Sequence, residues 1–283
     1  MVRPLSSEYS VQLGFSFSKT LGRNLEPYRN ATLNQDFDVA GIIDGKEGSG
    51  KSVFAQQVAA FLDKDHTLDV HKQICFTPEQ FREAVTTLPP GKAIVWDEAR
   101  SGLNRRRSTK EVNIEITDML AECRQKNLFM VIVMPTFYDM DMNVAVWRTR
   151  FLLHVWYSWE EDPKHPEPLI RGFFRYYSEE GKKKLYTNKW SRQRYEYPFL
   201  QGDSFENTFP KFYVASEEEY KKRKREAMRA YKTNQKDTWA IIHHLREKGI
   251  LRDGYAKLIG DFIEVGESTV YRYLSSAAAR INL

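Results

Sequence analysis

The stretch that decides the fold is Gly45-Lys46-Glu47-Gly48-Ser49-Gly50-Lys51-Ser52. It matches the pattern G-x-x-x-x-G-K-[ST] of the phosphate-binding P-loop. The apolar residues 39–43 precede it, and residues 53–62, with an apolar helical pattern, follow it. Glycines allow a tight turn whose N–H groups face phosphate oxygens, so this context predicts a nucleotide site. The alternative is a glycine-rich turn that matches by chance, which would make both flanking patterns coincidental.

The residues of this loop have separate expected roles. Lys51 is expected to reach the β- and γ-phosphates, and Ser52 to hold Mg²⁺. ATP and Mg²⁺ are therefore the expected ligands. The predicted nucleotide-binding residues are Gly45, Lys46, Glu47, Gly48, Ser49, Gly50, Lys51, Ser52 and Val53.

A second strand-like run supplies carboxylates for the metal and for catalysis. Residues 93–96 are apolar, and Asp97 and Glu98 follow them directly. Asp97 is expected to bind Mg²⁺, and Glu98 to orient and polarise the attacking water. The alternative is an ordinary surface turn after a strand. Asp97 lies 46 residues after Lys51, with a helix and a strand candidate between them, which favours the catalytic interpretation. An Asp-Glu pair favours a hydrolysing motor or switch over a small-molecule kinase.

A positive charge near the γ-phosphate typically contributes about 10³–10⁵ in rate. Arg124 is the predicted catalytic arginine, because it lies between an apolar helix and the strand 128–134; the alternative is a surface arginine. Arg148 and Arg150 are further candidates. For Arg105, Arg106 and Arg107, contact with DNA phosphates is as plausible as catalysis, and we assign them to DNA binding.

The order of elements predicts an α/β fold. Strand and helix patterns alternate from residue 37, and continuous apolar strands indicate a mostly parallel sheet with helices on both faces. We predict an N-terminal edge strand or arm over 1–36, with the strand at 11–17, and an ATPase domain over 37–215. That domain has a β-rich extension from about residue 150. Within the extension, residues 178–182 are predicted to form a hairpin turn and 184–186 a strand.

Two segments at the C-terminal end are expected to contact DNA. Residues 216–236 form a predicted basic helical linker in which Lys221, Lys222 and Arg223 are candidate anion contacts; the alternative is a solvated helix. Residues 237–283 are predicted to be all-α and resemble helix-turn-helix domains. That resemblance implies DNA contacts by Thr269, Tyr271 and Arg272. A three-helix interaction module without DNA is the alternative.

Composition limits the remaining classes. The 283 residues carry a net charge of +5, which leans toward a polyanionic partner. The two cysteines and six histidines show no zinc or disulfide spacing, so a reducing compartment is expected. The N-terminus lacks a signal pattern, and the longest apolar runs are too short to span a bilayer. We therefore expect a cytoplasmic protein without membrane insertion, in the host cytoplasm if it is viral or plasmid-borne.

These motifs, together with residues 120–133, resemble the FtsK/HerA superfamily of DNA-pumping ATPases over about residues 37–157. Within it the likeness is greatest to zonular-occludens-toxin-like and viral or plasmid ATPases. Many members carry Thr-Gln at the end of the sensor strand; here Met134-Pro135-Thr136-Phe137 stands there, with Thr136 as the polar residue. The resemblance implies a RecA-like P-loop NTPase that forms homo-oligomeric rings, often hexamers.

Three functions follow from this sequence as hypotheses. The first is an ATP-hydrolysing DNA translocase or packaging motor of a virus or mobile element. The second is a nucleotide-switched DNA-binding regulator, of the partition, transposition or transcription type, that does not translocate. The third is a membrane-associated ATPase of filamentous-phage assembly, against which the absence of a membrane span counts.

Overall fold

The computed structural model describes residues 8–97, 109–159 and 169–228, together with residues 242, 245–246, 254–262, 267–268 and 270–274 near the C-terminus. For residues 109–116 and 260–262 it describes the backbone alone. Glu98, Arg105, Arg106, Arg107 and Thr269, which carried predictions, lie outside the described residues.

The chain begins with two helices, α1 (Glu8–Leu13) and α2 (Lys19–Asn34). The predicted edge strand over 11–17 is therefore wrong. The Ser18 side chain caps α2 by accepting a hydrogen bond from the Leu21 N–H. The apolar residues of this region pack against α3 (Lys51–Leu62) rather than at a sheet edge, and Phe17 stacks on Phe61 with ring centroids 4.8 Å apart. The apolar residues of 11–17 are therefore explained by packing of α1 and α2 against α3, not by an edge strand.

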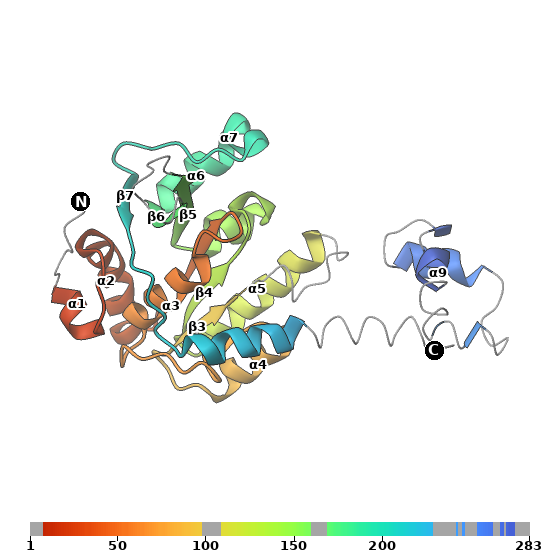
Figure 1. Cartoon of the computed structure of the whole chain (residues 1–283), viewed down its shortest axis with the longest axis horizontal. Helices are drawn as coiled ribbons and strands as arrows, with labels where there is room; N and C mark the ends of the chain where they lie inside the picture. Colours follow the sequence, from red (N-terminus) through yellow and green to blue (C-terminus); the bar gives the residue numbers. More distant parts are fainter. Residues whose placement is uncertain are drawn as a thin grey trace.

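Within the described part of the chain, seven strands form one sheet in the order β2-β3-β4-β1-β5-β6-β7. Figure 1 labels β3 to β7 of this sheet. The pairs from β2 to β5 are parallel, whereas β5–β6 and β6–β7 are antiparallel. The predicted α/β class with a mostly parallel sheet is confirmed, and the arrangement is compatible with a RecA-like fold. The strands are β1 (Val39–Gly45), β2 (Ile74–Cys75), β3 (Ala93–Trp96), β4 (Phe129–Val133), β5 (Phe151–Trp159), β6 (Leu169–Tyr177) and β7 (Ser204–Thr208).

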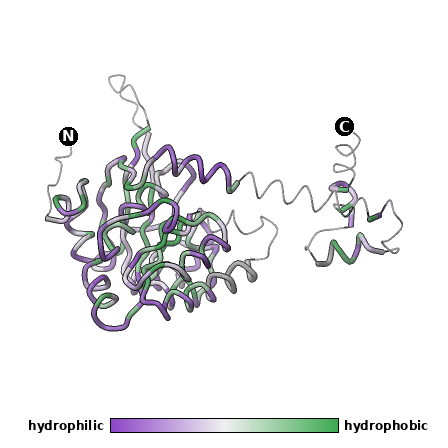
Figure 2. Tube along the Cα trace, turned by 90° about the horizontal axis from the view of Figure 1, so that it is seen from below, coloured by the Kyte–Doolittle hydropathy of each residue, from purple (hydrophilic) through white to green (hydrophobic). Residues whose placement is uncertain are grey.

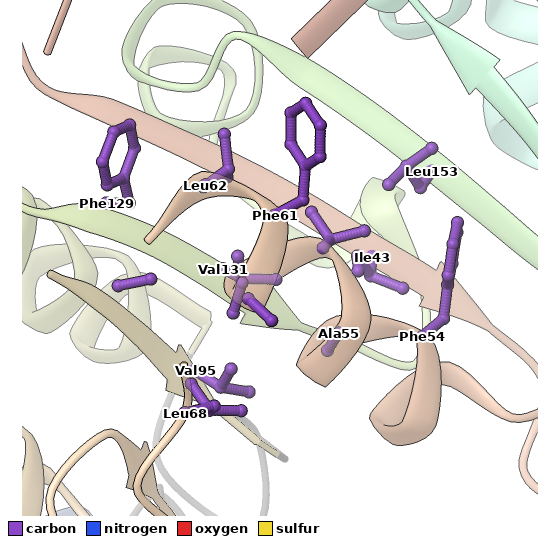
Figure 3. Packing of buried hydrophobic residues seen from close by; sticks show 14 of the residues in the cluster. Ile43, Phe54, Ala55, Phe61, Leu62, Leu68, Val95, Phe129, Val131 and Leu153 are labelled. Atoms are coloured by element: carbon purple, nitrogen blue, oxygen red, sulfur yellow. The ribbon is translucent and has the colours of Figure 1, made fainter. Parts of the chain in front are cut away.

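Helices cover both faces of the sheet, as predicted. Alternate residues of each strand enter two separate apolar clusters, so that Ile43 belongs to one and Ile42 to the other. The first cluster is formed with α1, α2 and α3 (Lys51–Leu62), and Figure 3 shows Phe54, Phe61 and Leu62 of α3 against strand residues. The second is formed with α4 (Pro78–Thr87), α5 (Thr109–Gln125) and the short helices η1 (Phe137–Asp139) and η2 (Asn143–Arg148). Figure 2 shows the hydrophobic chain segments gathered inside the α/β body.

The antiparallel side of the sheet departs from the sequence prediction. Residues 178–186 do not form a turn and a strand; α6 (Glu179–Thr187) occupies them. Ser178 caps this helix through the Gly181 N–H, and two glutamates in its first turn complement the helix dipole. Leu185 and Tyr186 are buried because they share the inward face of α6. A further helix, α7 (Lys189–Arg194), follows with Asn188 as its cap.

The C-terminal part contains helical segments. Residues 217–228 are helical, in agreement with the predicted helical linker as far as the description extends. Within residues 237–283, which were predicted to be all-α, α9 (Tyr255–Phe262) is helical. Residues 267–268 and 270–274 are also helical, and Ala256, Val270 and Leu274 form a small buried cluster. Among the described residues, no helix is both long and apolar enough to cross a membrane.

Candidate nucleotide-binding site

The loop between β1 and α3 has the backbone geometry of an anion cradle. Gly45, Gly48 and Gly50 have φ angles of 141°, 77° and 100°, a region that side chains disfavour. A Cβ on Gly45 would lie 2.0 Å from the carbonyl oxygen of Val155 on β5, so only glycine fits there. Gly50 is the N-cap of α3 and supplies no side-chain cap. The first N–H groups of α3 are therefore available to an anion, which the helix dipole also favours.

Lys51 extends along the inside of this loop. Its ammonium group donates hydrogen bonds to the carbonyl oxygens of Gly45 (2.6 Å) and Lys46 (2.7 Å). Burial lowers the pKa of Lys51, and the carboxylates of Asp44 and Asp97 act in the opposite direction. A cation held by two carbonyls at the mouth of a glycine loop can exchange them for phosphate oxygens.

Ser52 and Asp97 meet across the sheet. The Ser52 hydroxyl donates to Oδ1 of Asp97 at 3.1 Å, although the residues are 45 positions apart. Asp97 follows β3, Ser52 opens α3 after β1, and β4 lies between these two strands. The Asp97 carboxylate is fully buried. A hydroxyl and a carboxylate are the hard oxygen ligands that Mg²⁺ prefers, so this pair fits the expected metal.

The second oxygen of Asp97 is held by the helical segment 217–228. The Tyr220 hydroxyl donates to Oδ2, and the Lys224 ammonium lies 3.5 Å from the same atom. Burial is the main cause that raises the pKa of Tyr220, and Asp97 raises it further. Arg223 anchors the segment by donating to the carbonyl oxygens of Val70 and Ile74 beside β2. Sequence reasoning missed Tyr220 and Lys224 as site residues, since no local motif links a charged helix to a distant carboxylate.

A buried carboxylate immediately before the loop organises the other side of the site. Asp44 accepts from the Phe137 N–H at 2.7 Å and from the Tyr197 hydroxyl, and its Oδ1 lies 2.8 Å from Nδ1 of His154. The Tyr197 hydroxyl is also 3.0 Å from that of Thr136. Thr136, the predicted polar residue after β4, is therefore connected through Tyr197 to Asp44. Sequence reasoning did not identify this network, because its members come from separate segments of the chain.

Arg171 on β6 is another residue that the sequence did not single out. Its Nε donates to the carbonyl oxygen of Gly48 at 2.8 Å. The guanidinium group thus lies against the glycine loop and is exposed to solvent. Only the antiparallel addition of β6 next to β5 brings it there. A second cation beside Lys51 increases the positive potential at the loop.

The predicted catalytic arginines are not at this loop. Arg124 is exposed in the last turn of α5, just before β4 begins. Since β4 is parallel to β1 with Phe129 opposite Val39, Arg124 lies at the far end of the strands. A seven-residue strand separates the two ends by roughly 20 Å. Arg150, at the start of β5, lies at the same far end and pairs with Glu179 at 3.5 Å.

The predicted DNA contacts have different environments. Lys221 pairs with Glu217 at 2.5 Å, and Lys222 is exposed. Arg223 is engaged by the backbone carbonyls of Val70 and Ile74, so its guanidinium group is part of the fold. Tyr271 and Arg272 are both exposed on the C-terminal helical segment 270–274.

In comparisons with known proteins, no family model matches the chain, and no curated protein or solved structure is detectably similar to it. In the part of the chain that the structure describes, no three His, Cys, Asp or Glu side chains gather as a metal site. Ser52 and Asp97 are therefore the metal-binding candidates, together with phosphate oxygens of a bound nucleotide.

Proposed function

We propose that this protein is a Mg²⁺-dependent ATPase that converts ATP and water to ADP and phosphate. The observation that carries the proposal is the hydrogen bond between Ser52 and Asp97. It joins the P-loop to the acidic end of a strand two positions away in the sheet, which is the relation expected of a RecA-like NTPase. Fold and motif thus support the same chemistry independently.

Each residue of the site has a separate proposed role. Lys51 leaves the carbonyls of Gly45 and Lys46 and binds the β- and γ-phosphates. Ser52 and Asp97 hold Mg²⁺, which neutralises charge that develops on the phosphates. Glu98, next to Asp97 in sequence, orients the attacking water. Thr136 is the proposed sensor of the γ-phosphate, and its contact with Tyr197, which donates to Asp44 beside the loop, supports this role.

The ATPase is proposed to act as a DNA translocase or packaging motor of a virus or mobile element. The net charge of +5 and the predicted basic contacts support a DNA partner. Arg124 lies far from the P-loop of its own chain, so it can assist hydrolysis only at the loop of a neighbouring copy. This placement supports a homo-oligomeric ring in which each site lies between two subunits.

The test measures ATP hydrolysis with and without DNA. Lys51→Ala is expected to abolish hydrolysis, and Lys72→Ala, an exposed lysine outside the loop, serves as the control. Glu98→Gln is expected to retain ATP binding while losing turnover. Normal hydrolysis by Glu98→Gln would show that another group activates the water, and normal hydrolysis by Lys51→Ala would refute the site.

A nucleotide-switched DNA-binding regulator is the second candidate. The contacts of Tyr220 and Lys224 with Asp97 favour it, because they connect the metal side of the site to the segment that leads toward the C-terminal helices. A regulator should hydrolyse ATP slowly and should not displace a third strand from triplex DNA. A motor should displace that strand at a rate that depends on ATP.

A further inference from the structure

A surface beyond the nucleotide site combines exposed aromatic rings with basic side chains. It is built by α6, α7 and the end of η2, and we call it the aromatic-basic face. Trp147, Trp190 and Tyr195 are 59%, 65% and 57% exposed, which is unusual for side chains with this much apolar area. The face consists of Trp147, Lys183, Tyr186, Lys189, Trp190, Arg192, Arg194 and Tyr195.

Cations lie over the rings of this face. Arg192 is 4.6 Å from the ring centre of Tyr186, and Arg194 is 5.1 Å from that of Trp190. Lys183 lies 5.7 Å from the ring centre of Trp147. The rings of Trp147 and Trp190 are exposed with positive charge beside them, whereas Tyr186 is buried and only its partner Arg192 is exposed. Such surfaces are suited to planar, electron-rich groups that carry negative charge nearby.

A cavity of about 540 Å³ opens between Tyr138 and α7, at one side of the face. Its size falls within the range of roughly 300–1,000 Å³ that is usual for sites that take small ligands. Three tyrosines and two basic residues line it, together with the polar residues Thr187 and Gln193: Tyr138, Tyr186, Tyr195, Lys189 and Arg192. The glutamine amide can both donate and accept hydrogen bonds, as the edges of nucleobases require.

The charge of the segment indicates which partner fits. Residues 181–195 contain six lysines and arginines and no aspartate or glutamate. Lys182 is buried and Lys184 pairs with Asp203, which leaves four cations exposed on the face: Lys183, Lys189, Arg192 and Arg194. The Arg194 guanidinium also lies 3.8 Å from the exposed carboxylate of Glu196. A protein partner would also use aromatic and arginine side chains, but this excess of cations beside a cavity favours a polyanion.

We propose that the aromatic-basic face binds single-stranded nucleic acid. Bases stack on Trp190 and Tyr195 or enter the cavity, and phosphates contact Lys189, Arg192 and Arg194. Duplex DNA keeps its bases stacked inside, so it can use the cations but not the rings. The inference deepens the proposed function by naming the strandedness of the nucleic acid. Strand binding by the face does not require ATP hydrolysis; only the part that the face plays in a motor rests on the proposed function.

The face is physically connected to the nucleotide site. Tyr138 lines the cavity, its ring centre lies 6.0 Å from that of Tyr195, and its hydroxyl donates to the Glu196 carbonyl at 2.7 Å. The next residue, Tyr197, donates to Asp44, directly before Gly45. A bound base that moves Tyr195 therefore acts on a segment whose Tyr197 contacts Asp44, the residue directly before the loop.

The experiment measures binding of fluorescein-labelled oligonucleotides by fluorescence anisotropy, without ATP. The probes are a 20-nucleotide dT strand, a 20-nucleotide rU strand and a 20-base-pair DNA duplex. For Trp190→Ala, affinity for the single strands should fall about 5- to 100-fold, because a stacked base contributes that much. Trp159→Ala, which removes an equally exposed tryptophan at the end of β5, should leave affinity unchanged.

A second variant tests the cations. Lys189→Glu with Arg192→Glu should reduce the slope of log affinity against log salt by about 0.7 for every phosphate that the variant no longer neutralises. Lys72→Glu, a charge reversal elsewhere on the surface, should not change the slope. Thermal unfolding of each variant shows whether it is folded, and the comparison of dT with rU identifies whether DNA or RNA is the better ligand.

The outcomes separate this inference from the proposed function. If Trp190→Ala binds single strands as tightly as the unaltered protein, or if it weakens duplex binding as much as single-strand binding, the face is not a single-strand site. Absence of hydrolysis in every assay, with strand binding intact, would refute the ATPase and leave the face standing. ATP hydrolysis together with strand binding that Trp190→Ala does not change would support the ATPase and refute the face as a single-strand site.

Discussion

The nucleotide site and the aromatic-basic face belong to the same sheet but are built in different ways. The nucleotide site uses the parallel strands β1 and β3, whose carboxyl ends bring Ser52 and Asp97 together. The face uses α6 and α7, which follow the antiparallel strand β6, and the end of η2, which precedes β5; Lys182 of α6 donates to Ala145 and Thr149 at the end of η2. Parallel strands bring their carboxyl ends to one edge by topology alone. The antiparallel side needs individual side-chain contacts to hold its helices in place.

The largest expected effect comes from the metal side of the nucleotide site. Asp97→Asn removes the charge that binds Mg²⁺ beside Ser52. We expect Mg²⁺-dependent ATP hydrolysis to fall by at least about 100-fold, the usual reduction when one preorganised charge interaction is removed. Steady-state kinetics measures it. Asp36→Asn, at an exposed position with φ of 50° that asparagine accepts, is the matched control. Equal rates for both variants would place the metal elsewhere.

The next effect tests the link between the two regions. Tyr197→Phe removes a hydroxyl that donates to Asp44 and lies 3.0 Å from that of Thr136. Because a buried carboxylate then has one donor fewer, the free energy of unfolding should fall by about 1–3 kcal/mol. Urea unfolding measures this change. Tyr195→Phe, which keeps an exposed ring two residues away, should unfold like the unaltered protein. A decrease of the same size in both variants would mean that Asp44 is not the cause.

A smaller effect concerns Lys224. Its ammonium lies 3.5 Å from Asp97 Oδ2 and repels a divalent cation that binds there. Lys224→Gln should therefore lower the Mg²⁺ concentration for half-maximal ATP hydrolysis about threefold to tenfold. Lys222→Gln, two positions earlier and exposed, is the control. A higher Mg²⁺ requirement in Lys224→Gln would indicate that the lysine supports the site instead.

The smallest expected effect is a pH dependence of the free energy of unfolding, caused by Lys182 of α6 beneath the aromatic-basic face. Burial lowers the pKa of Lys182 to about 7, against about 10.4 in an unfolded chain. Between pH 7 and 8 the unfolded chain thus binds more protons at this residue, so this group makes stability rise with pH, by up to about 1 kcal/mol. In Lys182→Met this contribution should disappear. Urea unfolding at both pH values measures the difference, and an unchanged slope would show that Lys182 stays charged when folded.

The sequence predicted those elements that depend only on a few consecutive residues. The glycines and Lys51 of the loop and the strand before Asp97 follow from short patterns. The parallel sheet followed from the alternation of these elements. The segment 178–186 was misassigned because its charged and glycine residues resemble a turn, whereas Ser178 acts as a helix cap and Leu185 supplies burial. Local propensity does not reveal which face will be covered.

By itself, the sequence of this protein determined an α/β fold and predicted a glycine loop with a carboxylate partner, since backbone geometry and apolar periodicity are local properties. Tertiary structure alone decided that Tyr220 and Lys224 hold Asp97, that Arg171 contacts Gly48, and that Tyr197 joins Asp44 to the aromatic-basic face. These contacts join residues far apart in the chain, so they form only when the packed sheet brings distant segments together. No short-range pattern encodes them, because each depends on where every strand between them has been placed.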